Sequence, residues 1–507
     1  MAVAGRKAPG TEWSDGMGKS RLAKLRDELI SGKISSESLT LRCMEKIGRM
    51  DTGGNGINAV GAEMQELALD MAKKADDELR GGGPKPPFLG IPIVVKDNMA
   101  CKGQPFRNGS RVTENLVAPY TATVVDRLVA AGAVPLARTA MDEFAMGSSG
   151  EFHAFGATRN PWDTSRVAGG SSSGSAAAVA AGYVPFALGT DTGGSVRLPA
   201  TFCGISAFRP TYGVLSRYGI TAMASSLDQV GPMARHVEDL ALGLSVMAGL
   251  DPMDSTSLNL PSAKDLAHCT PLTLGGKKIG YFAGDAKALH PEVKARTDAA
   301  IKTLEANGAK IVEIDLPCAS IALETYCLLN TAEVSSNLSR FDGVRYGARS
   351  PIDSLGGMTA KTRSAHLGVE AKRRVLLGTF CLSKGHFDAY YLKALRARNY
   401  IAKSMTETFE SVDFIAAPVS PMVAFPLGEK TADPLEMYMM DILTVLPALA
   451  DVPALAVPAG LADGLPVGVQ FMGPRLSDCS LLRLGHAFQQ VTDHHELEPA
   501  AFSTSLS

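Results

Sequence analysis

Hydrophobic residues recur at helical spacing near the start of the chain. Three leucines repeat every three or four residues, as on one face of an α-helix: Leu22, Leu25 and Leu29. Ser35 precedes a second pattern of this kind and is expected to cap that helix. A third amphipathic pattern spans residues 62–79 and ends in the run Gly81-Gly82-Gly83-Pro84. The chain from about residue 20 to about residue 80 is therefore predicted to be helical.

From residue 89 the pattern changes to short apolar runs that alternate with helical patterns such as residues 123–131. The runs expected to form strands are residues 91–95, 133–136, 184–188, 279–282, 311–314, 412–417, 454–457 and 467–471. A helix that Pro291 opens separates the fourth and fifth runs, and long helical patterns cover about residues 320–410. This alternation predicts an α/β fold whose core is a large mixed β-sheet, or a mostly parallel one, covered by helices on both sides.

The length of 507 residues exceeds the roughly 100–200 residues of a typical domain, so one large core with insertions competes with two domains. We favour a single domain over residues 1–507, in which the segment 279–314 is either a βαβ insertion or a subdomain. The expected parts are a helical portion at about 20–80, a core at about 88–250, a βαβ-containing insertion at about 275–320, and a portion of helices and strands at about 320–497.

Charge and composition exclude several classes of protein. The 50 basic and 52 acidic residues give a net charge of −2, so no global field attracts nucleic acid or an anionic membrane. No apolar stretch reaches the roughly 20 residues of a membrane span. The eight cysteines contain no CxxC pair, which speaks against zinc sites and disulfide frameworks, so no metal site is expected.

The segment before Leu22 has no apolar run of a secretory signal and lacks the arginine and serine bias of a transit peptide. The scattered cysteines fit a reducing compartment. We therefore expect a cytoplasmic protein and favour an organelle matrix less.

Two glycine- and serine-rich segments, residues 169–175 and 189–199, flank one apolar stretch of small residues. Such segments are often flexible linkers, but the tight order Asp191-Thr192-Gly193-Gly194-Ser195-Val196-Arg197 and the apolar stretch between them favour a site in the core. Consecutive backbone N–H groups before a nucleophile can form an oxyanion hole. The candidate hole comprises Thr192, Gly193, Gly194 and Ser195.

The run Gly170-Ser171-Ser172-Ser173-Gly174 also satisfies G-x-S-x-G, the nucleophile elbow of α/β-hydrolases, with Ser172 at its centre. That interpretation needs a downstream histidine, and no candidate lies in a recognisable motif: His236, His268, His290, His366, His386, His486, His494 and His495. Lys96, at the end of an apolar strand, is an alternative base. A lysine there is usually a solvated cap, but burial beside the serine loops lowers a lysine pKa from about 10.4 toward neutrality.

Three segments together resemble the amidase signature family: GIPIVVKDN from Gly90, GGSSSGSAAAVAAG from Gly169 and TDTGGSVRLPA from Thr190. The resemblance implies the amidase-signature fold and a triad of Lys96, Ser171 in an unusual cis peptide, and the nucleophile Ser195. It further implies that a proton passes from Ser195 through Ser171 to Lys96 while Ser195 attacks an amide carbonyl and forms an acyl-enzyme.

Further segments are similar to the glutaminase subunits of tRNA-dependent amidotransferases, so that the resemblance covers residues 22–497. They are MDEFAMGSSGEF from Met141, RPTYGVLSRYGI from Arg209, SSLDQVGP from Ser225, SSNLSRFDGVRYG from Ser335, KRRVLLGTF from Lys372 and DPLEMYMMDILT from Asp433. This branch implies glutamine as the substrate. It places the cation for the α-carboxylate at Arg374, the anion for the α-ammonium at Asp441, and Tyr326 in the pocket lining.

The same resemblance implies partners. A tRNA-binding, kinase-like B subunit would hold ATP and magnesium, a small C subunit would complete the complex, and this chain would hold no cofactor. The released ammonia would amidate Glu-tRNA(Gln), or in some organisms Asp-tRNA(Asn), with the tRNA contacted mainly through the partner.

Two positions depart from the family pattern. Ser173 stands where the family often has glycine, and residues 105–110 replace an expected threonine-rich run, which can reshape the pocket mouth. Two other functions stay open. A stand-alone amidase would act on small aliphatic or aryl amides, and a catalytically idle scaffold would need none of Lys96, Ser171 and Ser195.

Overall fold

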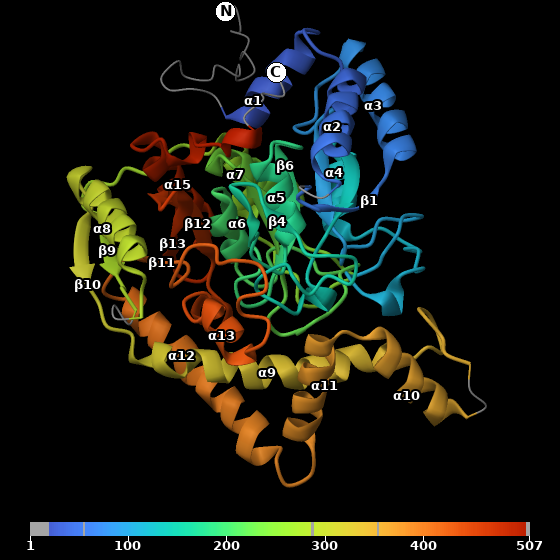
Figure 1. The fold of residues 1–507 in the computed structure, drawn as a ribbon. Helices are drawn as coiled ribbons and strands as arrows, with labels where there is room; N and C mark the ends of the chain where they lie inside the picture. Colours follow the sequence, from blue (N-terminus) through green and yellow to red (C-terminus); the bar gives the residue numbers. More distant parts are fainter. Residues whose placement is uncertain (1–19, 54–55, 285–287, 352–353, 503–507) are drawn as a thin grey trace, which may run out of the picture.

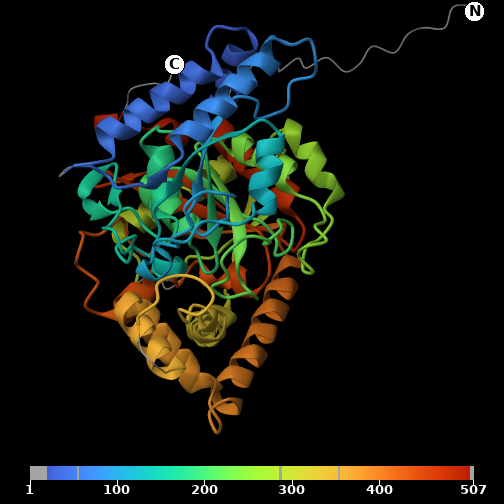
Figure 2. The same cartoon turned by 90° about the vertical axis from the view of Figure 1, so that its right-hand side faces the viewer.

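The computed structural model describes residues 20–502 apart from 54–55, 285–287 and 352–353. The N-terminal segment on which the expected location of the protein rests lies outside these residues. Figures 1 and 2 show a central body of strands and helices, with long helices between α9 and α12 projecting from one end.

The strands are β1 (Val60–Glu63), β2 (Pro92–Lys96), β3 (Val134–Thr139), β4 (Arg159–Asn160), β5 (Asp163–Val167), β6 (Phe186–Asp191), β7 (Ser206–Arg209), β8 (Gln229–Ala234), β9 (Lys278–Tyr281), β10 (Lys310–Glu313), β11 (Phe414–Pro418), β12 (Ala454–Ala462) and β13 (Leu465–Met472). Eleven of them form one sheet in the order β1-β3-β2-β6-β8-β7-β12-β13-β11-β9-β10. The pairs β3-β2, β2-β6, β11-β9 and β9-β10 are parallel, and the others are antiparallel. The predicted mixed sheet is thus confirmed.

The helices are α1 (Arg21–Ile30), α2 (Ser36–Met50), α3 (Gln65–Arg80), α4 (Thr123–Ala130), α5 (Ser173–Ala180), α6 (Arg197–Cys203), α7 (Val237–Met247), α8 (Pro291–Ala306), α9 (Ala322–Asn337), α10 (Leu355–His366), α11 (Val369–Leu382), α12 (Lys393–Phe409), α13 (Pro434–Tyr438), α14 (Val445–Leu449) and α15 (Asp478–Gln490). Two short 3-10 turns matter below, η7 (Met439–Asp441) and η8 (His494–Glu496). None of the described helices is long and apolar enough to cross a membrane.

Central strands are buried at every position, although successive side chains point to opposite faces of a sheet. Helices must therefore cover both faces. Helices α5 and α6 contact each other and the central strands, whereas α7 contacts α4, α15 and strands β7 and β8. This double cover explains why the strands read as continuous apolar runs without alternation.

The sequence patterns locate most elements. The three leucines are buried on α1, and the Ser35 hydroxyl caps α2 by accepting the N–H of Ser38 at 3.0 Å. The predicted start of the third helix was wrong. Residues 60–63 form strand β1, although the prediction placed residues 62 and 63 in the helix. That strand forms the edge of the sheet and pairs with β3, a tertiary contact that outweighs local helical preference. The segment 278–313 is a βαβ unit whose β9 pairs with β11, so it extends the main sheet.

Helices α9 and α11 pack closely in the projecting arm. A Cβ atom on Gly378 of α11 would overlap the backbone carbonyl of Thr331 on α9. This close contact is therefore possible only with glycine at position 378, because the backbone of one helix would have to move to make room for a side chain. It also fixes α11, which carries Arg374, against α9, which carries Tyr326.

We expect Gly378→Ala to lower the free energy of unfolding by about 1–3 kcal/mol, because overpacking forces the two helices apart. Urea denaturation followed by circular dichroism measures this change. Gly356→Ala is the matched control, since a Cβ there meets no atom within 4 Å and alanine favours helix, so stability should hold or rise slightly. Equal effects of both substitutions would contradict the packing argument.

Candidate active site

Lys96 ends β2 beside the parallel strand β6, and helix α5 begins at Ser173 against both strands. Its Nζ lies 2.8 Å from the Oγ atoms of Ser171 and Ser172 and 2.9 Å from Oγ1 of Thr190. The lysine side chain is completely buried. The fold therefore surrounds one amine with three hydroxyl groups from two segments.

Burial lowers the pKa of Lys96 to about 7, although the carboxylates of Asp142, Asp191 and Asp228 oppose this shift. Removing an ammonium group from water is expensive, and hydroxyl groups replace hydration only in part. Both the neutral and the charged amine are consequently accessible near pH 7. A neutral amine at this position can accept a proton from a neighbouring hydroxyl.

The peptide bond between Gly170 and Ser171 is cis, as the family resemblance implied. Asp142 fixes the surrounding loops, since its carboxylate accepts the N–H groups of Gly150 at 3.1 Å and Phe152 at 2.9 Å. A Cβ on Gly170 would overlap that carboxylate, so only glycine fits there. Burial raises the pKa of Asp142 to about 6.

Ser195 comes within reach of the same loop, because its carbonyl accepts the N–H of Ser172 at 3.1 Å. Its exposed fraction is 8%, whereas Lys96 and Ser171 are fully buried. The Ser195 hydroxyl donates no hydrogen bond within residues 20–502 as described. The contact between Lys96 and Ser171 is thus in place, and the link between Ser171 and Ser195 requires that hydroxyl to turn.

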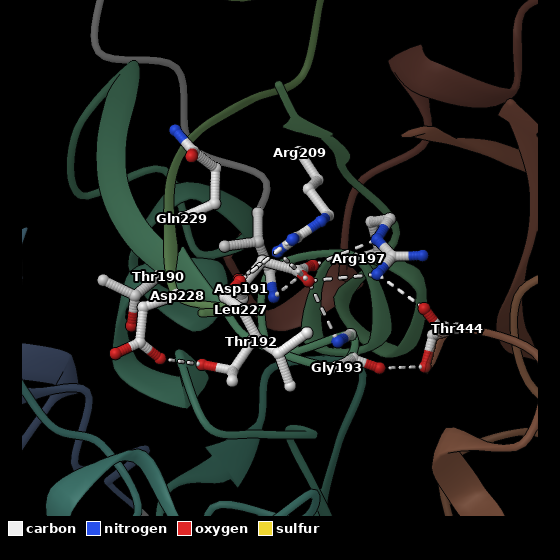
Figure 3. A network of polar contacts seen from close by, with 12 residues as sticks. Thr190, Asp191, Thr192, Gly193, Arg197, Arg209, Leu227, Asp228, Gln229 and Thr444 are labelled. Atoms are coloured by element: carbon white, nitrogen blue, oxygen red, sulfur yellow. Dashed lines mark hydrogen bonds and ion pairs between the residues drawn. The ribbon is translucent and has the colours of Figure 1, made fainter. Parts of the chain in front are cut away.

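Two buried arginines hold the loop that carries Ser195 (Figure 3). Arg197 contacts Asp191 through Nε at 3.0 Å and Nη2 at 3.0 Å, and Arg209 reaches the same carboxylate at 3.2 Å. Burial alone would raise the pKa of Asp191, but the two guanidinium groups outweigh it and hold the pKa at about 2. Arg197 also donates to the carbonyl of Thr444 at 2.8 Å, which ties the loop to the C-terminal half.

The Asp191 carboxylate also shapes the candidate oxyanion hole. It accepts the N–H of Gly194 at 3.0 Å, so that group is already engaged. The N–H groups of Thr192, Gly193 and Ser195 donate to no residue that the structure describes, which leaves them for a ligand. The hydroxyl of Thr444 binds the Gly193 carbonyl at 2.6 Å and orients this backbone.

The three predicted substrate-binding residues line one cavity of about 100 Å³, together with Asn330 and Tyr438. They come from three separate helical segments: Tyr326 from α9, Arg374 from α11 and Asp441 from η7. The Tyr326 ring packs directly against Gly193, where a Cβ would overlap it. The cavity therefore adjoins the loop of Ser195.

The Arg374 guanidinium is fixed on one side and open on the other. It donates to Glu370 at 2.7 Å and to Asn330 at 3.0 Å, and it lies 5.2 Å from the Tyr438 ring centre. Its Nη2 has no partner among the described residues. Burial opposes the charge, but Glu370, Tyr438 and Tyr326 raise the pKa of Arg374 above its usual value. The guanidinium group therefore stays cationic.

Asp441 accepts a hydrogen bond from the Ser148 hydroxyl at 2.7 Å on Oδ2, while Oδ1 accepts none within the described part of the chain. Burial raises the pKa of Asp441 to about 7, against the opposing effects of Ser148 and Arg374. A cationic ligand beside Oδ1 would bring this carboxyl back to its charged form.

Neither departure from the family pattern lies in the cavity around Arg374. Ser173 is buried in α5, where its hydroxyl donates to Thr158 at 3.0 Å. None of residues 105–110 lines the cavity around Arg374. Ser110 contacts Glu143, which accepts the N–H of Gly368 just before α11, and the N–H of Arg107 donates to Asp97 beside Lys96 at 3.3 Å.

Several residues of the site lacked a usable signal in the sequence. The sequence suggested Ser172 only as the serine of a nucleophile elbow. In the structure it binds Lys96 and donates to the Thr190 carbonyl at 3.2 Å, and no described histidine contacts it. Asp142 and Asp228 lie in the quoted segments MDEF and DQVGP, where their acidic side chains were the only signal. Asp228 accepts the hydroxyl of Thr192 at 2.7 Å. Glu370 had none.

We expect Asp191→Asn to destabilise the protein by about 3–5 kcal/mol, because it leaves two arginines charged, buried and unpaired. Chemical denaturation gives the value. Asp163→Asn is the control, since its pair with Arg166 is partly exposed and is worth about 1 kcal/mol or less. If both substitutions cost the same, the network around Asp191 does not hold the loop.

The comparisons with known proteins agree with this geometry. The glutamyl-tRNA(Gln) amidotransferase A subunit of Chloroflexus aggregans is 48% identical over 475 residues, 93% of this chain and 96% of that protein. The protein of the same name from Geobacillus thermodenitrificans is 47% identical over 482 residues, 94% of this chain and 98% of that protein. The resemblance inferred from the sequence is thereby confirmed.

Solved structures extend the comparison. The crystal structure of the glutamyl-tRNA(Gln) amidotransferase A subunit from Thermotoga maritima is 37% identical, with a TM-score of 0.74, over 93% of this chain and 96% of that one. Native peptide amidase from Stenotrophomonas maltophilia is 30% identical, with a TM-score of 0.79, over 92% and 96%. The family model described as Amidase matches residues 39–482. The chain therefore belongs to the amidase family.

Proposed function

We propose that this protein is the glutamine-hydrolysing subunit of a tRNA-dependent amidotransferase. It releases ammonia from glutamine and delivers it to a partner subunit, which converts Glu-tRNA(Gln) to Gln-tRNA(Gln). The observation that carries the proposal is one cavity beside the Ser195 loop that presents the cation of Arg374 and the carboxylate of Asp441. The names of the relatives from Chloroflexus aggregans and Geobacillus thermodenitrificans support it.

This pair of charges suits an α-amino acid. A zwitterion is costly to desolvate unless each charge meets its opposite, so a pocket for it needs both signs. Arg373 and Arg374 share the carboxylate of Glu370, which leaves one excess positive charge for the α-carboxylate of glutamine. Oδ1 of Asp441 receives the α-ammonium, and Tyr326 lines the path to Ser195.

The mechanism follows from the contacts around Lys96. The Ser195 hydroxyl turns toward Ser171 and attacks the side-chain amide carbon of glutamine, while its proton moves to Ser171 and the Ser171 proton moves to neutral Lys96. The N–H groups of Thr192, Gly193 and Ser195 stabilise the oxyanion. The proton returns to the leaving nitrogen, ammonia departs, and water hydrolyses the acyl-enzyme.

A partner subunit fits two features of the surface. Large apolar side chains are exposed along α11, at 70% for Leu376, 45% for Leu377 and 44% for Phe380. The net charge of −2 gives the chain no field for tRNA, which the proposed B subunit holds with ATP and magnesium. A small C subunit completes the complex, this chain carries no cofactor, and the cytoplasm is the proposed location.

A stand-alone amidase is the second candidate. One observation favours it: the backbone superimposes better on the peptide amidase, at a TM-score of 0.79, than on the Thermotoga maritima protein, at 0.74. Backbone similarity reports the shared fold, whereas the choice of substrate depends on the pocket. A simple amide offers no charges to Arg374 and Asp441.

Ser195→Ala should abolish glutamine-dependent ammonia release, since the substitution removes the nucleophile. Ammonia is measured for both proteins with and without co-expressed partner subunits, mischarged tRNA and ATP. Ser173→Ala is the control, because it removes a neighbouring buried hydroxyl that does not contact Lys96, and it should retain activity.

Turnover that needs Ser195 and rises with the partners supports the amidotransferase. Equal turnover of simple amides without partners, and little of glutamine, would favour the stand-alone amidase. If the protein shows no turnover and a fluorophosphonate does not label Ser195, the remaining interpretation is a catalytically idle scaffold.

The pH profile separates the two groups whose pKa values lie at about 7. Lys96 accepts a proton only when neutral, so kcat should fall as pH drops through 7. Asp441 binds an ammonium only when charged, so KM should rise over the same range. In Asp441→Asn the KM should be high and nearly independent of pH, while the kcat limb persists. A wild-type kcat that is flat from about pH 5 to 9 would exclude Lys96 as the base.

A further inference from the structure

Two histidines and a glutamate meet where the C-terminal segment packs on the core. His236 directly precedes α7, and His495 and Glu496 belong to η8. Nε2 of His236 lies 3.0 Å from Oε1 of Glu496, and Nε2 of His495 lies 3.6 Å from the same oxygen. The three donor atoms all lie within 4.8 Å of one another, and both histidines are buried.

We propose that His236, His495 and Glu496 form a zinc-binding site. Four-coordinate Zn²⁺ with bonds of about 2.0–2.1 Å places its ligand atoms about 3.3 Å apart, close to two of the observed separations. Imidazole and carboxylate are zinc donors, whereas Mg²⁺ requires oxygen ligands in an octahedron. The site goes beyond the proposed function and does not depend on it.

The ring nitrogen of His236 that faces away from the glutamate supports this assignment. Nδ1 of His236 points toward Oδ2 of the buried Asp239 at 3.8 Å, and neither atom has a hydrogen-bond partner among the described residues. Metal-bound histidines almost always donate their other N–H to such a group. Nδ1 of His495 is buried without a described partner, so this second contact holds for His236 alone.

The ion also has a path to the site. Glu496 is half exposed, and it lines a cavity of about 450 Å³ with four basic residues, Arg21, Lys24, Lys33 and Arg235, and with the acidic Glu28. Arg21 pairs with Glu498 and Lys33 with Glu28, so the charges that oppose a cation in this cavity are those of Lys24 and Arg235. Water from the cavity can fill the fourth position.

Bound zinc would join η8 to the start of α7, which itself contacts α1 (Figure 1). The two partners come from positions 260 residues apart, His236 and Glu496. Binding only to the folded chain stabilises it by mass action. The ion would therefore act as a clamp for the C-terminal end of the chain.

The test uses the full chain, stripped with EDTA and titrated with ZnCl₂ or MgCl₂. Zinc bound after dialysis is measured by mass spectrometry of the metal, and stability by thermal melting. Eight free cysteines can also bind zinc, so the number of equivalents alone decides nothing. We expect the wild type to hold one more equivalent of zinc than His495→Ala and Glu496→Gln, and to melt higher with zinc but not with magnesium.

Matched variants make the result specific. His494→Ala removes the adjacent histidine, which faces Asp493, and should keep the extra equivalent. Asp239→Asn should weaken zinc binding about 10- to 100-fold through the orientation of His236. If Asp239→Asn does not fold, the half-exposed Glu496→Gln still decides. Equal zinc contents in the wild type, His495→Ala and Glu496→Gln, or no shift in melting, would overturn the proposal.

Discussion

The active-site region depends on one buried carboxylate. Asp191 lies at the end of β6 without contact to water, and its charge persists only because Arg197 and Arg209 meet it. Each of these groups alone would be too costly to bury, so the three stabilise one another. The same carboxylate binds the N–H of Gly194, and through this contact it sets the backbone of the Ser195 loop.

Lys96 and Arg374 are two buried basic side chains of the active-site region, and their surroundings differ. Around Lys96 the neighbours are mainly hydroxyl groups, which replace the lost hydration of a charged amine only in part, so burial lowers its pKa. Around Arg374 the neighbours are a carboxylate and two aromatic rings, which keep the cation charged. Burial therefore leaves Lys96 with a pKa of about 7, so that it can act as a base, whereas Arg374 stays charged and can bind a carboxylate.

The projecting helices supply the second half of the pocket. Helix α11 brings Arg374 to Tyr326 of α9, and the carbonyl of Thr444 links the C-terminal half to Arg197 across 247 residues. Gly193 and Gly194 are needed because Tyr326 and Thr444 occupy the space that side chains would take. The pocket is therefore sensitive to packing far from Ser195.

The sequence by itself determined the elements whose faces repeat locally, such as the leucines of α1, the Ser35 cap and the apolar strands. It also located the loops of Lys96, Ser171 and Ser195, because their residues are close together or form long motifs. Tertiary structure alone decided what depends on distant partners: β1 at the sheet edge, the use of the Gly194 N–H by Asp191, and the meeting of His236 with Glu496. Periodicity reports which side of an element is apolar. It cannot report which element lies against that side, and burial and pKa follow from that contact.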